Sequence, residues 1–180
     1  MAEPQETTET TETIGAGELT NSDFRILVVD NDPPLAAAMT ESLETEDYAV
    51  SVATSGPDGL KMIQQNNYDV VITDLMMNDV DGMAILEQTK QLLPDAEIIM
   101  VTGHASVPLA VEAMQSGAYN FLEKPITPKR LRAITVRAIQ SVGLRRQNAE
   151  LKQRLDEKFG FDGIIYCSAK MQAVIDRLKR

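Results

Sequence analysis

Tryptophan is absent from the 180-residue chain, and cysteine and histidine occur once each. A single cysteine, Cys167, cannot form an intramolecular disulfide bond, which indicates a reducing, cytoplasmic setting. With only His104 beside it, a Cys/His metal site is excluded. No apolar run approaches the roughly 20 residues of a membrane span. The first 20 residues lack a basic flank and an apolar core, so no secretory signal is expected there.

Basic residues are scarce in most of the chain, and the net charge is −10. Residues 1–23 hold six acidic residues and no basic one, whereas residues 144–180 hold nine basic and five acidic residues. An acidic main domain is a poor nucleic-acid binder, so neither nucleic acid nor a membrane is expected as a partner. The Thr/Glu-rich residues 1–22 are predicted to be disordered, because they contain too few apolar residues for a core.

Hydrophobic residues make up 43% of the chain and aromatic residues only 4%, so an aliphatic core is expected. Five short apolar runs read as buried strands, at 25–30, 49–53, 69–74, 97–102 and 119–122. Segments with helical spacing separate and follow them, at 34–46, 57–66, 83–93, 107–116 (closed by Gly117) and from Thr127 or Pro128 onward. This alternation predicts an α/β fold, a parallel sheet with helices on both faces.

Polar residues follow the strands at the carboxyl edge of this sheet, where ligands bind in such folds. They are Asp30, Asn31, Asp32, Asp74, Thr102 and Lys124. An isolated Asp74 would be a turn residue or a helix cap. The other polar residues at the same edge indicate a functional site instead. Clustered oxygens suit Mg²⁺, and a carboxylate beside it can accept a phosphoryl group whose charge a lysine neutralises.

With these residues in this order, the sequence resembles a bacterial two-component response regulator receiver domain over residues 23–143. The resemblance implies a flavodoxin-like, doubly wound five-stranded sheet of strand order 2-1-3-4-5. It implies phosphorylation of Asp74, in VVITD, by a sensor histidine kinase with Mg²⁺ as cofactor, and transcription control through an output domain. The chain is then a phosphoacceptor with self-phosphorylation and autodephosphorylation chemistry rather than an enzyme.

The resemblance also assigns roles to individual residues. Asp30, Asn31, Asp74 and the backbone carbonyl of Met76 would hold the metal. Thr102 and Phe121 would be the switch pair, Lys124 would contact the phosphoryl group, and Pro125 would follow a cis peptide bond. Met76 and His104 are candidates for tuning the reaction, although His104 can also be a solvated loop residue.

Two positions depart from the family pattern. Asn31 stands where a second, metal-binding acid is usual, so weaker Mg²⁺ binding is expected, unless Asp32 substitutes for that acid. Asn78 replaces a proline that is common in the loop after the phosphoacceptor, which leaves that loop less rigid.

The length and partial heptad pattern of the fifth helix predict that two copies of the chain pair. The fifth helix is expected to continue to about Lys158, with residues 144–160 as a linker. With Ile134 at a heptad a position, Asn148 and Leu155 fall at a, and Leu144 and Leu151 at d. A homodimer through this linker and the fourth and fifth helices is therefore predicted, although a lone solvated helix is the alternative.

Residues 161–180 resemble the opening of the AAA+ domain of nitrogen-regulator-type, sigma-54-dependent activators. Ser168, Met171, Gln172 and Val174 carry this likeness. We expect the start of a truncated AAA+ domain here. No GxxxxGK[ST] phosphate loop occurs in the 180 residues, so no ATPase activity is expected of them.

Two other functional readings remain open. Asp30 and Asp32 could be the nucleophile and the acid/base of a haloacid-dehalogenase-type phosphohydrolase. Alternatively, the unusual Asn31 could mark an interaction module that works without phosphorylation.

Overall fold

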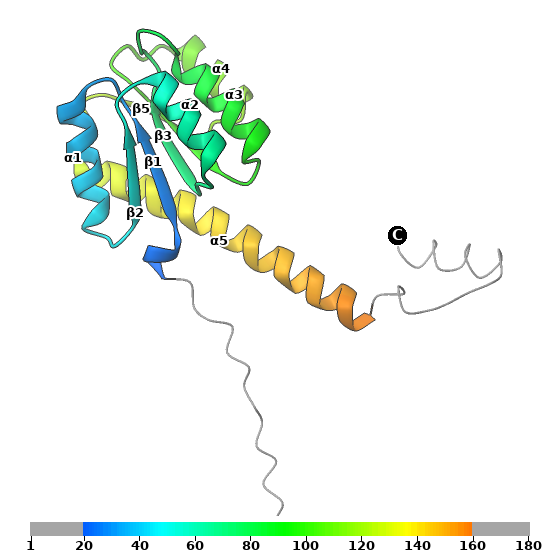
Figure 1. Ribbon diagram of the computed structural model, residues 1–180. Coiled ribbons are helices and arrows are strands. Elements are labelled where there is room, and N and C mark those ends of the chain that lie inside the picture. Colours follow the sequence, from blue (N-terminus) through cyan, green and yellow to red (C-terminus); the bar gives the residue numbers. More distant parts are fainter. Residues whose placement is uncertain (1–19, 160–180) are drawn as a thin grey trace, which may run out of the picture.

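Five parallel strands form the centre of the molecule (Figure 1). The computed structural model describes the backbone of residues 20–159 and the side chains of residues 20–155. The strands are β1 (Arg25–Val29), β2 (Ala49–Ala53), β3 (Val70–Asp74), β4 (Glu97–Thr102) and β5 (Asn120–Glu123). Their order, β2-β1-β3-β4-β5, and the parallel pairing of all neighbours confirm the predicted fold class.

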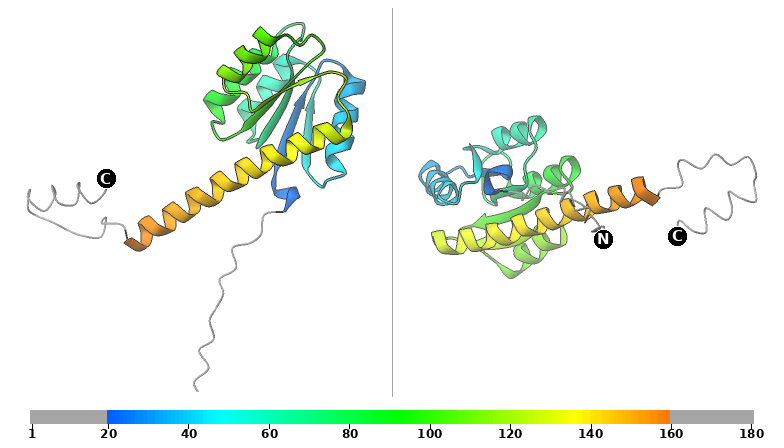
Figure 2. Two further views of the ribbon diagram at one scale, coloured as in Figure 1. Left: turned by 180° about the vertical axis from the view of Figure 1, so that it is seen from behind. Right: turned by 90° about the horizontal axis from the view of Figure 1, so that it is seen from below.

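Five helices cover the sheet on both faces (Figure 2). They are α1 (Pro33–Glu44), α2 (Gly56–Gln65), α3 (Gly82–Leu92), α4 (Val107–Gln115) and α5 (Pro128–Phe159). The first four begin at side-chain caps, in which Asp32, Ser55, Asp81 and Ser106 accept hydrogen bonds from the first turn. Gly117 follows α4 with a φ of 97°, in the left-handed region that a glycine enters without strain. Helix α5 extends past the edge of the sheet (Figure 1).

The three central strands separate two aliphatic cores. On one face, alternate residues of the sheet pack against α1 and α5, with Leu43 and Leu131 fully buried. On the other face, the intervening residues pack against α2, α3 and α4, with Ile85 and Leu86 fully buried. Because both faces of β1, β3 and β4 are covered, these strands read as uninterrupted apolar runs.

The predicted N-terminal disorder is wrong for its last residues. Asn21–Asp23 form a 3₁₀ helix, in which Thr20 and Asp23 cap each other, and Asn21 Nδ2 donates to the carbonyl of Glu46. The rest of that prediction, and the AAA+ resemblance after residue 160, lie outside the described residues. Between residues 20 and 159 no helix is long and apolar enough to cross a membrane.

Candidate functional site

The carboxyl edge of the sheet brings the predicted site residues together. Asp30 follows β1, Asp74 ends β3, Thr102 ends β4 and Lys124 follows β5. The Lys124 amide donates to the Thr102 carbonyl at 2.8 Å, which fixes the end of β5 beside β4. Asp30 and Lys124, 94 positions apart, thus meet because all five parallel strands end at one edge of the sheet.

Lys124 joins two buried carboxylates. Its Nζ lies 2.8 Å from Asp30 Oδ2 and 2.8 Å from Asp74 Oδ2, while Asp30 is 0% and Asp74 6% exposed. Burial alone lowers the pKa of the Lys124 ammonium group, but the hydrogen bonds and charges of Asp30 and Asp74 outweigh it, so its pKa is raised. The lysine therefore remains a cation beside the two carboxylates at neutral pH.

Backbone amides orient the other oxygen of each carboxylate. Asp30 Oδ1 accepts a hydrogen bond from the Asp32 amide at 2.9 Å, and Asp74 Oδ1 accepts one from the Met76 amide at 3.1 Å. An ionised carboxylate offers about four lone-pair sites. Both groups can therefore accept further bonds from a cation or a phosphoryl donor.

The donor set fits Mg²⁺ with fewer charges than three acids would provide. Asp30 and Asp74 supply two carboxylates at one place, and the exposed Asn31, which follows Asp30 in the sequence, carries an amide oxygen of the kind that Mg²⁺ accepts as a ligand. Among the residues that the structure describes, no group of three or more His, Cys, Asp or Glu side chains could hold a metal ion. The Asp32 side chain caps α1 by accepting from the Leu35 amide at 3.3 Å, so it is already engaged.

The predicted switch residues occupy different environments. Thr102 is fully buried, and its Oγ1 accepts a hydrogen bond from the His104 amide at 3.2 Å. Phe121 is half-buried and packs against the core beneath α3 and α4. His104 is exposed and contacts Thr102 through its backbone. The Lys124–Pro125 peptide bond is cis, as predicted.

Met76 and Gly82 both approach Asp74 through their backbone. The Met76 side chain is 57% exposed, so its amide is the part that holds Asp74. Gly82 was missed by sequence reasoning, yet a Cβ on it would lie 2.4 Å from the Asp74 carbonyl oxygen. The Asp-Gly pair that opens α3 is the signal that could have identified this close approach.

Comparisons with known proteins identify the family of the chain. Residues 26–136, more than half of the chain, match the response regulator receiver domain family. Over 155 residues the chain is 32% identical to the nitrogen assimilation regulatory protein NtrX of Azorhizobium caulinodans, covering 85% of this chain and 34% of that protein. It is 34% identical over 128 residues to the C4-dicarboxylate transport transcriptional regulatory protein DctD of Rhizobium meliloti, covering 71% and 28%. The chain thus spans about a third of these relatives.

Solved structures give the same result. A crystal structure of NtrX from Brucella abortus superposes with a TM-score of 0.68 at 27% identity, over 85% of this chain and 33% of that one. The beryllofluoride-activated NtrC4 receiver domain dimer superposes with a TM-score of 0.63 at 34% identity, over 66% of this chain and 98% of that one. Similarity to the NtrC4 structure therefore covers almost a whole receiver domain.

Proposed function

Because this chain belongs to the response regulator receiver domain family of two-component systems, we propose that Asp74 accepts a phosphoryl group from a sensor histidine kinase. One observation carries the proposal: Lys124 lies 2.8 Å from both Asp30 and Asp74 at the carboxyl edge of the sheet. A buried, oriented carboxylate beside a fixed cation is what a phosphoryl acceptor requires.

The residues divide the chemistry as follows. A carboxylate oxygen of Asp74 attacks phosphorus, the bond from phosphorus to the kinase histidine nitrogen breaks, and the imidazole leaves with its electron pair. The Lys124 ammonium group neutralises charge on the transferred oxygens, and the Thr102 hydroxyl donates to one of them. Asp30, Asp74, Asn31 and the Met76 carbonyl would hold Mg²⁺, which supplies further charge neutralisation when bound.

The output follows from what surrounds Thr102. When Thr102 turns toward the phosphoryl group, space opens for Phe121, and the surface formed by α4 rearranges. That surface exposes apolar side chains on one side of α4, with Val107 78%, Val111 47% and Met114 49% exposed. This face, together with α5 and its extension, is the proposed dimer interface. Transcription regulation through a sigma-54-type output domain is part of the proposal, since the relatives are transcriptional regulatory proteins.

The experiment is mass mapping after phosphorylation. The chain is incubated with acetyl phosphate and Mg²⁺, trapped with borohydride and digested, and the label is expected on Asp74 alone. Asp74→Asn should abolish it. Label on Asp30 would instead support the phosphohydrolase. An unlabelled but folded chain would support a phosphorylation-independent interaction module, the reading that Asn31 and the two-carboxylate site favour.

A further inference from the structure

Two buried carboxylates hold α5 at the amino edge of the sheet, opposite the phosphorylation site. Asp69, just before β3, and Glu97, which begins β4, are 5% and 6% exposed. Asp69 forms an ion pair with Arg146. Glu97 Oε1 lies 2.9 Å from Arg145 Nη2 and accepts a hydrogen bond from Ser141 Oγ at 2.8 Å. We call these four charged residues the clamp.

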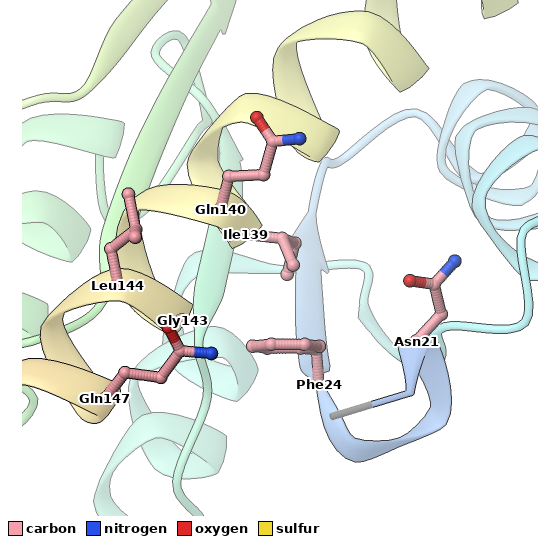
Figure 3. Close-up of a pocket in the computed structure, with 7 residues that line it drawn as sticks. All are labelled: Asn21, Phe24, Ile139, Gln140, Gly143, Leu144 and Gln147. Atoms are coloured by element: carbon pink, nitrogen blue, oxygen red, sulfur yellow. The ribbon is translucent and has the colours of Figure 1, made fainter. Parts of the chain in front are cut away.

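The clamp acts where apolar packing of α5 is incomplete. A pocket of about 600 Å³ lies between the start of β1 and α5 (Figure 3). Asn21 and Phe24 line it on one side, and the α5 residues Ile139, Gln140, Gly143, Leu144 and Gln147 on the other. The Arg146 guanidinium lies 5.6 Å from the centroid of the Phe24 ring, which lines this pocket. Ion pairs therefore fix a stretch of helix that few buried side chains secure.

The clamp also determines which side of α5 faces outward. Successive helical residues are about 100° apart, so Leu144, Leu151 and Leu155 lie within about 40° of one another, and Arg146 lies about 140–180° from them. These leucines are 67%, 58% and 55% exposed. When Arg146 faces Asp69, this leucine stripe lies on the opposite side of α5, although Leu144 also lines the pocket.

The strands that hold the clamp also carry the phosphorylation site. Asp69 precedes β3, which ends in Asp74, and Glu97 begins β4, which ends in Thr102. All side chains of both strands are buried, and the two strands pair from Val70 with Glu97 to Asp74 with Val101. Each strand is therefore a short, closely packed connection between the site and the clamp.

We propose that Asp69, Glu97, Arg145 and Arg146 are positioning residues that fix the direction and rotation of α5 beyond the sheet. They present the leucine stripe to the same stripe of a second copy of this chain. The proposal rests on the pairing described under Proposed function and adds the residues that orient the pairing helix.

Paired substitutions test the clamp without leaving a buried charge alone. One variant combines Asp69→Asn with Arg146→Met, and the other combines Glu97→Gln with Arg145→Met. The new amide oxygens can still accept from the Arg25 amide and from Ser141, which bond to the native carboxylates. Arg154→Met is the matched control, because it removes the same charge from a helix residue that has no ion pair within the described part of the chain.

The measurement is the distance between two spin labels, placed at Glu44→Cys on α1 and Glu150→Cys on α5 in a Cys167→Ser background. The labelled chain is diluted into excess unlabelled chain, so that only distances within one copy contribute. A narrow distribution is expected for the native clamp and the Arg154 control, and a broadened or shifted one for both paired variants. An unchanged distribution in variants that fold, judged by circular dichroism, would overturn the proposal.

Two further readouts separate this proposal from the function on which it rests. Labelling of Asp74 by acetyl phosphate is expected to be unchanged in the paired variants, and the dimer association constant is expected to fall about 5-fold or more. If the native chain does not pair in sedimentation, the pairing function fails, but the label distances still decide whether the clamp orients α5.

Discussion

Lys124 neutralises two carboxylates that would otherwise face each other in a buried site. Substituting it therefore tests how much this neutralisation contributes to stability. Lys124→Met should lower the free energy of unfolding at neutral pH by about 1–3 kcal/mol, because both charged groups lose a hydrogen-bond partner. Urea denaturation at neutral pH measures this, with the exposed Lys61→Met as control. An equal loss of stability in the Lys61→Met control would contradict the argument from the two buried carboxylates.

The raised pKa of Lys124 gives a second expectation, at alkaline pH. The pKa is above the ordinary value of 10.5, because the bonds to Asp30 and Asp74 outweigh burial. The stabilisation is therefore complete below pH 10.5 and is lost as the pH rises through the folded-state pKa. Alkaline unfolding should steepen there in the native chain and not in Lys124→Met. Identical alkaline unfolding profiles for the native chain and Lys124→Met would contradict a stabilising, raised pKa of Lys124.

Asn31 is predicted to weaken Mg²⁺ binding, because it replaces a charged acid with a neutral amide. Asn31→Asp should lower the Mg²⁺ concentration for half-maximal acetyl-phosphate labelling by about tenfold, if the added charge contributes about 1.4 kcal/mol. The control is Asn78→Asp, which adds the same charge in the loop after β3. No shift on Asn31→Asp, or an equal shift in the control, would show that the missing acid does not limit binding.

At the scale of elements, Gly143 weakens α5 at the base of its extension. A Cβ at this position would lie 3.7 Å from Phe24 Cζ, an ordinary contact at the wall of the pocket. Gly143→Ala should therefore raise the free energy of unfolding by about 0.5–1 kcal/mol, because glycine loses more backbone entropy in a helix. Thermal unfolding measures the change, and Ala149→Gly, farther along the helix, is the comparison. Destabilisation by Gly143→Ala would mean that the pocket wall cannot accept a methyl group.

Sequence patterns predicted the elements well because the strands are buried on both faces and the helices start at polar caps. The position of each site residue at a strand end followed from the same alternation. The clamp was not predicted, since Asp69 and Glu97 each begin an apolar run and their arginine partners lie more than 45 residues away. The pairing of distant charges depends on how α5 crosses the sheet, which local patterns do not encode. The same holds for the 3₁₀ helix at Asn21–Asp23, which depends on contact with Glu46.

For the molecule as a whole, pairing should depend on the α5 extension and on the phosphoryl state. Sedimentation of the chain with and without beryllofluoride and Mg²⁺ should give dimer constants that differ roughly 5- to 150-fold, the effect of a coupling of ~1–3 kcal/mol. A version ending at Gly143 and the Leu151→Glu variant should both pair more weakly. Equal constants for the long and short versions would exclude the extension as a pairing element. Equal constants with and without the phosphate mimic would indicate a permanent dimer.

The unbroken length of α5 means that a small change in its direction displaces its far end by a larger distance. From Gly143 to Phe159 the helix continues for about 24 Å at 1.5 Å per residue. A tilt of about 5° at its base would therefore displace its far end by about 2 Å, by the same helix geometry. A small tilt of α5 at the amino edge of the sheet would therefore move Phe159 farther than it moves Gly143. A small rearrangement around Asp74 that tilts α5 would thus become a larger displacement at the far end of the helix.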